Sequence, residues 1–162
     1  AYDAVRAAGA VPFGMYALNS MRIEKGYRTW KGDLSTDYTM LEGSLERFIR
    51  FDKPQDFPGK AALLAEKAAG PKQRFATMTL DDAGAADAPY MSPIWHNGDM
   101  VGQTTSGDFG FRINKAVVLG MLRTDLNVPG TKVEVEVYGQ KMTATVHADA
   151  PLWDPDNARI RA

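Results

Sequence analysis

The spacing of apolar residues changes from a helical to an alternating period along the chain. From Phe13 to Glu24 apolar residues recur every three to four positions and Gly26 ends the pattern, which predicts a helix. Residues 60–69 are rich in alanine, leucine, lysine and glutamate, which favour helices, and predict a second helix. A short helix is also expected at residues 2–8. The first part of the chain is therefore predicted to be mainly helical.

Beyond Pro71, apolar and polar residues alternate in short segments separated by turn residues. This period of two is typical of strands with one buried face. Six segments are strand-like: Arg74 to Leu80, Tyr90 to Trp95, Met100 to Thr105, Ala116 to Arg123, Lys132 to Tyr138 and Lys141 to His147. They predict an all-β second half that closes into a barrel or packs as a sandwich.

Turn residues mark the connections within this β half. Asn97-Gly98 favours a type I′ hairpin turn, and Gly139-Gln140 is a candidate for a type II′ turn. The Ala-rich stretch from Asp81 to Pro89 is predicted to be an exposed loop. The run from Ser106 to Gly110 is rich in glycine like a phosphate-binding loop but lacks the lysine and the following helix, so a tight β connection is predicted.

Less regular segments lie within the helical part. Residues 27–39 are polar and rich in turn formers, which predicts an ordered loop. The apolar positions between residues 45 and 51 fit a strand or a helix equally well. We place a domain boundary near Pro71, with one domain at residues 1–71 and a second at residues 72–162.

Composition narrows the class of protein. With 162 residues, 44% hydrophobic and 24% charged, the chain is globular and can bury one sizeable core or two small ones. A formal net charge of -1 gives no basic footprint for nucleic acid, so an anionic ligand has to be held locally. No apolar run approaches the roughly 20 residues of a membrane helix, so no membrane partner is expected.

The chain contains no cysteine, which excludes disulfides, thiolate nucleophiles and cysteine-ligated metals. A cytoplasmic location, or the mitochondrial matrix in a eukaryote, fits this composition best. The chain starts without methionine inside a predicted helix, so we expect it to be part of a longer protein. The two histidines, His96 and His147, lie on separate predicted strand ends without metal-ligand spacing, and no metal site is predicted.

One stretch, residues 22–30, combines groups that could bind a ligand. Glu24 lies at the end of an apolar helix, close in sequence to Trp30 and several cations. A carboxylate could accept paired N–H donors from an aminopyrimidinone ring, the indole could pack on the ring, and the cations could meet an anionic tail. Helix-end charges in solvent are the simpler interpretation, and the pattern alone favours it.

Four segments resemble, in order, the motifs of the folate-binding aminomethyltransferase family. This family includes the glycine-cleavage T-protein and the C-terminal halves of dimethylglycine and sarcosine dehydrogenases. Its T-protein pattern is Ala-Arg-Asp-x-x-Arg-x-Glu-x-Gly, then Tyr-Gly, Pro-Leu/Val-Glu, and Asp-Phe-Ile/Pro-Gly-Lys/Arg. The similar segments here are Ala17-Leu18-Asn19-Ser20-Met21-Arg22-Ile23-Glu24-Lys25-Gly26, Trp30-Lys31-Gly32, Met40-Leu41-Glu42-Gly43 and Asp56-Phe57-Pro58-Gly59-Lys60.

The departures from the T-protein pattern resemble the dehydrogenase branch. Leu18-Asn19 replaces Arg-Asp and Trp30 replaces tyrosine, as that branch prefers. Residues 94–98 and 101–107 also resemble it, and the likeness runs in ordered succession from about Pro12 to Pro151. The resemblance implies an α+β protein. Residues 1–71 would be the helical, ferredoxin-like end of a folate-binding domain, and residues 72–162 a six-stranded Greek-key β-barrel.

The same resemblance implies a function. The parent enzyme would be a flavin-dependent dimethylglycine/sarcosine dehydrogenase-like demethylase, which uses FAD to act on a small N-methylated amino acid and passes the carbon unit to tetrahydrofolate. Two alternatives stay open: a T-protein-like aminomethyltransferase without a flavin domain, and a structural barrel module with no folate role. The encoded sequence upstream of Ala1 would separate the first two.

Carried over by position, four residues would contact the folate. Glu24 matches the glutamate that hydrogen-bonds the pterin, Trp30 an aromatic near the cofactor, and Lys53 a basic residue toward the folate tail. Arg74 is a weaker candidate for the same work as Lys53. The family's assisting aspartate and the flavin fingerprint match nothing here, so no catalytic residue is assigned. We expect the chain alone to be inactive, to hold only part of the tetrahydrofolate pocket, and to need the N-terminal flavin and folate-binding regions of the same enzyme as partners.

Overall fold

The computed structural model describes residues 1–81 and 86–161. Its helices are α1 (Tyr2–Ala7), α2 (Met15–Glu24), the 3-10 helix η1 (Glu46–Phe48) and α3 (Lys60–Ala69). Its strands are β1 (Gln73–Leu80), β2 (Pro93–His96), β3 (Asp99–Gly110), β4 (Lys115–Arg123), β5 (Lys132–Val137) and β6 (Gln140–His147), with a second 3-10 helix, η2 (Thr124–Leu126), after β4. The expected helices and six strands are therefore present.

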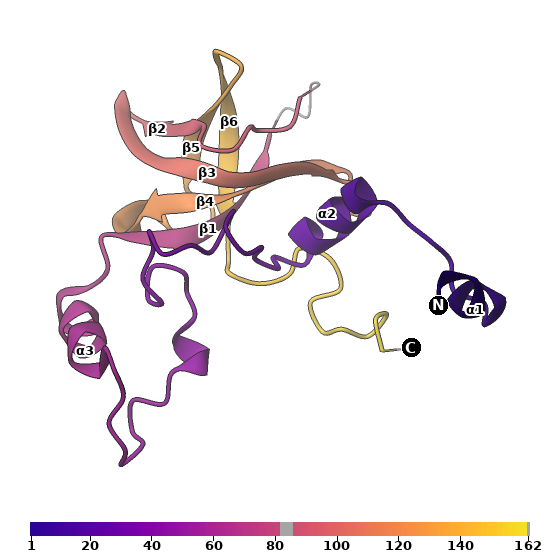
Figure 1. The fold of residues 1–162 in the computed structure, drawn as a ribbon. Helices are drawn as coiled ribbons and strands as arrows, with labels where there is room; N and C mark the ends of the chain where they lie inside the picture. The colour runs from indigo at the N-terminus through magenta and orange to yellow at the C-terminus, as the bar shows by residue number, and fades with distance from the viewer. Residues whose placement is uncertain (82–85, 162) are drawn as a thin grey trace.

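The six strands close into a barrel in the order β1-β4-β3-β2-β5-β6, with every described neighbouring pair antiparallel (Figure 1). Strands β2, β3 and β4 follow one another as neighbours, and β1 returns beside β4 across a long connection, which is a Greek-key arrangement. Closure removes the free sheet edges that would otherwise pair with other chains. The predicted six-stranded Greek-key barrel is confirmed.

Two local predictions in the β half were wrong. The run from Ser106 to Gly110 continues β3 as a strand paired with β4. Gly107 is needed because a Cβ atom there would lie 2.2 Å from the carbonyl oxygen of Ala88, so glycine marks a close backbone approach. The β5–β6 turn is formed by Tyr138 and Gly139, whose φ angles of 48° and 81° are both positive, as in a type I′ turn.

The structure also describes the predicted Asn97-Gly98 turn, the loop at residues 27–39 and part of the loop at residues 81–89. Asn97 and Gly98 form the predicted type I′ turn, with φ angles of 51° and 89°. Residues 27–39 form an ordered loop with an isolated bridge between Trp30 and Leu34. Within the loop predicted at residues 81–89, residues 82–85 lie outside the described part of the chain.

Strands β1 and β4 are buried on both faces and separate two apolar clusters. Inside the barrel, alternate residues such as Met78 and Val118 join side chains from β5 and β6. Phe75, from β1, packs in an outer cluster, and the cluster's other buried members are Ile23, Val117, Leu119 and Met121. Because both faces of β4 are covered, its sequence is a continuous apolar run and does not alternate between apolar and polar residues.

Helix α2 lies against β3 and β4 at one side of the barrel (Figure 1). Its buried residues are Ser20, Ile23 and Glu24, and the last two lie three and four positions after Ser20, on the same face of the helix. The Ser20 hydroxyl donates a hydrogen bond of 2.6 Å to the carbonyl oxygen of Phe109, which anchors the helix to β3. The residues after β6 return to the end of α2, where the backbone N–H groups of Leu152 and Trp153 donate hydrogen bonds to the carbonyl oxygen of Glu24.

Residues 1–71, all of them described, contribute helices, loops and the single bridge but no strand. Helix α1 buries none of its residues and stands apart from the barrel, while α3 lies on the side opposite α2 (Figure 1). Among the described residues, no helix has both the length and the apolar character that crossing a bilayer requires.

Candidate functional site

Helix α2 separates two cavities because its residues alternate between two faces. One face lines a cavity of about 280 Å³ through Met15, Leu18, Asn19 and Arg22, which meet Tyr27, Arg28 and Thr29 of the following loop. The other face lines a cavity of about 420 Å³ through Tyr16, Ala17, Ser20, Met21 and Glu24. Residues two apart on a helix point about 200° away from each other. Arg22 and Glu24, which the sequence placed in one receptor, therefore line different cavities.

The carboxylate of Glu24 is buried, with only 1% of the residue exposed. Its Oε1 accepts hydrogen bonds from the backbone N–H groups of Arg112, at 2.6 Å, and Ile113, at 3.2 Å. Glu24 thereby ties the end of α2 to the β3–β4 turn. Its Oε2 accepts no hydrogen bond within the described part of the chain, which leaves one oxygen for a donor in the 420 Å³ cavity.

The 420 Å³ cavity combines aromatic walls with carboxylates. Tyr16, Phe109 and Phe111 line it, and the two phenylalanine rings meet edge to face with centroids 5.1 Å apart. Asp87 and Asp108 also line it. Burial, aided by the nearby charge of Asp108, raises the pKa of Asp87. Arg112 is the one cation among the described lining residues. The aromatic and carboxylate walls suit a flat ligand that presents N–H donors.

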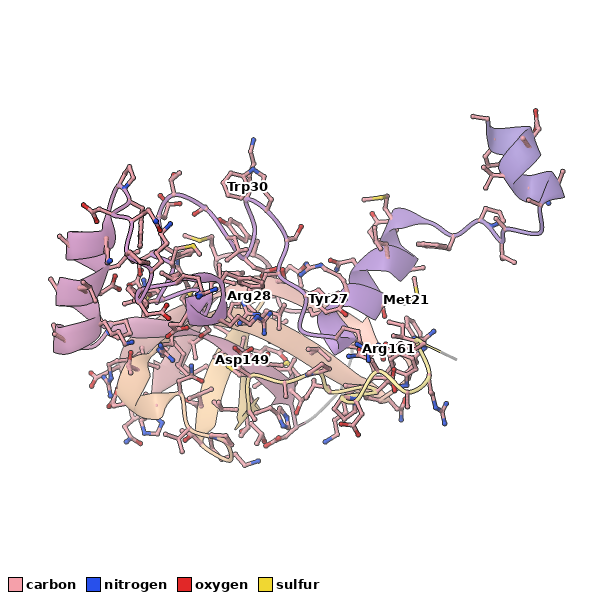
Figure 2. All side chains as sticks on the ribbon, turned by 90° about the horizontal axis from the view of Figure 1, so that it is seen from below. Met21, Tyr27, Arg28, Trp30, Asp149 and Arg161 are labelled. Atoms are coloured by element: carbon pink, nitrogen blue, oxygen red, sulfur yellow. The ribbon has the colours of Figure 1, made fainter. Side chains whose placement is uncertain are left out.

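Trp30 occupies a different position. Its side chain is 68% exposed, on the loop that follows α2, and it lines neither cavity beside the helix. Figure 2 shows Trp30 at the outer edge of this loop, away from Met21 on the wall of the 420 Å³ cavity. The structure therefore leaves the indole available to a surface partner but does not bring it to Glu24.

Lys53 and Arg74 lie in further, separate surroundings. The Nζ atom of Lys53 is 4.8 Å from the ring centroid of Phe57. Arg74 forms an ion pair with Glu46 and lines a third cavity, of about 460 Å³. The four residues predicted to bind folate thus do not converge within this chain.

A buried polar network that sequence reasoning missed joins the loop after α2 to the barrel. Asp33 is fully buried, and its Oδ2 accepts hydrogen bonds from Arg22 Nη1, at 2.7 Å, and from the backbone N–H of Thr29, at 2.8 Å. Its Oδ1 accepts bonds from the hydroxyls of Thr105, at 2.6 Å, and Ser106, at 2.8 Å. The Thr-Ser-Gly run in β3 was a signal for this site, but nothing in the sequence linked it to Asp33.

A second ion pair connects the same loop to the residues after β6. A single guanidinium nitrogen of Arg28, Nη2, donates hydrogen bonds of 2.9 Å to both carboxylate oxygens of Asp149, and Figure 2 labels the two residues close to each other. The guanidinium group also lies 3.9 Å from the ring centroid of Phe75. This stacked and paired geometry fixes the loop against β1.

His147 ends β6 and lines the 460 Å³ cavity, where its Nε2 lies 2.8 Å from Thr79 Oγ1. Burial, aided by Lys115, lowers its pKa from the usual 6.5. The native state therefore binds fewer protons than the unfolded state just below pH 6.5. The contribution of His147 to the free energy of unfolding should be fully present above that pH. It should decrease as the pH falls toward the folded-state pKa.

Urea denaturation across the range of pH about 5 to 8 checks this expectation, because histidine titrates there. His147→Gln should flatten the decrease, whereas the matched variant His96→Gln should keep it. An equal decrease in His147→Gln would contradict the assignment to His147.

The family is decided by a match to the β half. A family model described as the glycine cleavage T-protein C-terminal barrel domain matches residues 73–154, about half of the chain. This chain belongs to the glycine cleavage T-protein family. The family's GCVT N-terminal domain model also matches residues 1–53. The two matched T-protein segments lie on either side of Pro71, and the domain boundary placed there stays a prediction.

Relatives within the T-protein family include two kinds of enzyme. The chain is 39% identical to the mitochondrial dimethylglycine dehydrogenase of Homo sapiens, over 99% of this chain and 19% of that protein. It is 34% identical to the mitochondrial sarcosine dehydrogenase of Mus musculus, over 99% of this chain and 18% of that protein. It is also 34% identical to a Synechocystis aminomethyltransferase, over 82% of this chain and 35% of that protein. The chain thus spans about a fifth of the length of the dehydrogenases.

A solved structure has the same fold. The glycine cleavage system aminomethyltransferase T from Bartonella henselae superposes with a TM-score of 0.77 at 26% identity. The match covers 86% of this chain and 38% of the aminomethyltransferase. This chain therefore shares its fold with the matched part of that aminomethyltransferase.

Proposed function

We propose that this chain serves as the C-terminal part of a folate-dependent one-carbon-transferring enzyme. In that enzyme, a flavin-dependent demethylase of the dimethylglycine/sarcosine dehydrogenase kind, FAD would be held by other regions of the protein. Tetrahydrofolate would accept the carbon unit taken from a small N-methylated amino acid. The cofactor supplies most of the one-carbon chemistry, so the residues of this chain bind and orient it. The compartment would be the mitochondrial matrix in a eukaryote and the cytoplasm elsewhere.

The observation that carries the proposal is the free carboxylate oxygen of Glu24 in the 420 Å³ cavity. The aminopyrimidinone ring of a pterin presents adjacent N–H donors, which a buried carboxylate oxygen can accept. The apolar walls formed by Phe109 and Phe111 match the flat face of such a ring. These residues fit the pterin end of folate.

The remaining predicted contacts would be made outside this cavity. Trp30 is exposed and can meet a ligand or the rest of the enzyme, and Lys53 and Arg74 offer cations for the folate tail. The cavity on the other face of α2, with Arg22 and Arg28 beside Tyr27, offers a second place for an anionic group. The proposal therefore requires further regions of the enzyme to complete one pocket around α2.

A flavin-free aminomethyltransferase is the second candidate. The Synechocystis aminomethyltransferase and the Bartonella henselae structure favour it, since the chain covers 35% and 38% of those proteins. The dehydrogenase kind is preferred because the identity to human dimethylglycine dehydrogenase, 39%, is higher and extends over 99% of the chain. A flavin-binding region encoded upstream of Ala1 would support the dehydrogenase, and a short upstream region without one would support the aminomethyltransferase.

Glu24→Gln tests the pterin contact in the full-length protein. Loss of a charge-assisted hydrogen bond is expected to weaken tetrahydrofolate binding by about 10- to 100-fold. Glutamine is nearly isosteric and can still accept the N–H groups of Arg112 and Ile113, so folding should persist. Isothermal titration measures the dissociation constant, with Glu42→Gln, outside the 420 Å³ cavity, as the matched control. Unchanged affinity in Glu24→Gln would refute the assignment.

The chain by itself is expected to bind tetrahydrofolate weakly or not at all, because the predicted contacts do not converge within it. Titration of the isolated chain against the full-length protein measures this difference. Tight binding by the isolated chain would mean that the pocket is complete here and has been misplaced.

A further inference from the structure

The residues after β6 form a strap, defined here as residues 148–157, that crosses under the end of α2. The backbone N–H groups of Leu152 and Trp153 donate hydrogen bonds of 2.9 and 3.1 Å to the carbonyl oxygen of Glu24. The last carbonyl groups of a helix have no partner within the helix. The strap therefore completes the C-terminus of α2 at the residue whose carboxylate faces the 420 Å³ cavity.

The Trp153 ring lies close to two cations, Arg112 and Lys25. The guanidinium carbon of Arg112 lies 4.1 Å from the Trp153 ring centroid, and the Nζ atom of Lys25 lies 5.5 Å from it. Both distances fall within the range of cation–π attraction. Arg112 is the residue whose backbone N–H holds Glu24 Oε1 at 2.6 Å, and Lys25 follows Glu24 in the chain. One indole thus contacts both neighbours of the carboxylate.

The strap is held in place independently of this indole. The Lys25 ammonium donates hydrogen bonds to the carbonyl oxygen of Asp154, at 2.8 Å, and to Asn157 Oδ1, at 2.9 Å. The Asp154 carboxylate accepts the backbone N–H groups of Arg159, at 3.0 Å, and Ile160, at 3.2 Å. At the other end of the strap, Asp149 pairs with Arg28. Removing the indole should therefore leave the path of the strap intact.

We propose that Trp153 is a positioning residue that sets the orientation of the Glu24 carboxylate. It does so by holding the β3–β4 turn through Arg112 and the end of α2 through Lys25, so that Oε1 stays occupied and Oε2 faces the cavity. The inference rests on the proposed function, in which Glu24 accepts the N–H donors of a pterin. Trp153 does not line the 420 Å³ cavity, so it acts through Glu24 and not by touching the ligand.

The experiment is a double-mutant cycle in the full-length protein, with the dissociation constant of tetrahydrofolate as the readout. Trp153→Leu is expected to weaken binding by about five- to tenfold, since it removes the attraction for both cations. Trp153→Phe, which keeps an aromatic face, should restore most of the affinity. In the Glu24→Gln background, Trp153→Leu should have little further effect, because residues that act through one group are not additive.

Trp95→Leu is the matched control, since Trp95 is also half-buried and carries the ammonium group of Lys141 4.5 Å from its ring centroid, but on β2. It should leave tetrahydrofolate affinity unchanged. If Trp153→Leu does not fold, Trp153→Met takes its place, because methionine fills more of the space left by the indole while still removing the aromatic face. Its loss of affinity should also be non-additive with Glu24→Gln.

The outcomes separate the two proposals. Unchanged affinity in Glu24→Gln would overturn the proposed function. If Glu24→Gln weakens tetrahydrofolate binding as expected, two results would overturn the positioning role alone. One is a loss of affinity from Trp153→Leu that adds fully to the loss from Glu24→Gln. The other is an affinity in Trp153→Phe as low as that in Trp153→Leu.

Discussion

Asp33→Ala should destabilise the protein by about 3–5 kcal/mol, the cost of breaking a buried charge pair from one side. The carboxylate is fully buried and accepts four hydrogen bonds, from Arg22, Thr29, Thr105 and Ser106. Alanine would leave the Arg22 guanidinium, whose side chain is 15% exposed, without its counter-charge. It would also leave the hydroxyl groups of β3 and a backbone N–H of the loop without their acceptor.

Urea denaturation followed by circular dichroism measures the change in the free energy of unfolding. Asp37→Ala is the matched control, because Asp37 lies in the same loop and is exposed. Its carboxylate accepts a local hydrogen bond from the Ser35 hydroxyl, and its backbone N–H donates one to Ser35 Oγ. Surface substitutions of this kind change stability by about 0.5 kcal/mol or less. A change of that small size in Asp33→Ala would show that the network does not join the loop to the barrel.

The barrel could be predicted from the sequence because its signals are local. Alternation along β5 and the residues of the Asn97-Gly98 turn specify strand faces and a hairpin without reference to distant parts of the chain. The extension of β3 through Gly107 could not be predicted. The glycine there serves a close approach to Ala88, which lies across the fold and leaves no periodic trace.

The candidate site was predicted less completely, for a geometric reason. Arg22 and Glu24 are close in sequence, so the pattern indicated one receptor, but the rotation of α2 directs them into different cavities. The partners that decide each side chain's role lie far along the chain. Glu24 meets Arg112 and Ile113 of the β3–β4 turn, and Asp33 meets hydroxyl groups of β3. Such long-range polar pairs follow from the barrel's topology and not from spacing along the chain.

Phe75→Ala should cost about 3–5 kcal/mol of stability, in the range of aromatic-to-alanine changes in protein cores. Phe75 is 1% exposed and packs in the outer cluster with Ile23, Val117, Leu119 and Met121. The cluster lies between the barrel and α2, so a cavity there cannot be filled without moving the helix. The ring also carries the Arg28 guanidinium, 3.9 Å from its centroid, and alanine would remove this support from the Arg28–Asp149 pair.

Two comparison variants separate the loss of packing in Phe75→Ala from the loss of the cation–π contact with Arg28. Phe75→Leu keeps most of the apolar volume but removes the aromatic face, so it should cost about 1–2 kcal/mol, in the range of a partly buried cation–π contact and a small packing change. Phe48→Ala is the control, because Phe48 also lies beneath an arginine, Arg47, but is 66% exposed, so little burial is lost. Denaturant midpoints of the three variants should follow the order Phe48→Ala, Phe75→Leu, Phe75→Ala from least to most destabilised. If Phe75→Leu were as destabilising as Phe75→Ala, the contact with Arg28 would dominate over packing, and the outer cluster would contribute less to holding α2 on the barrel than its burial indicates.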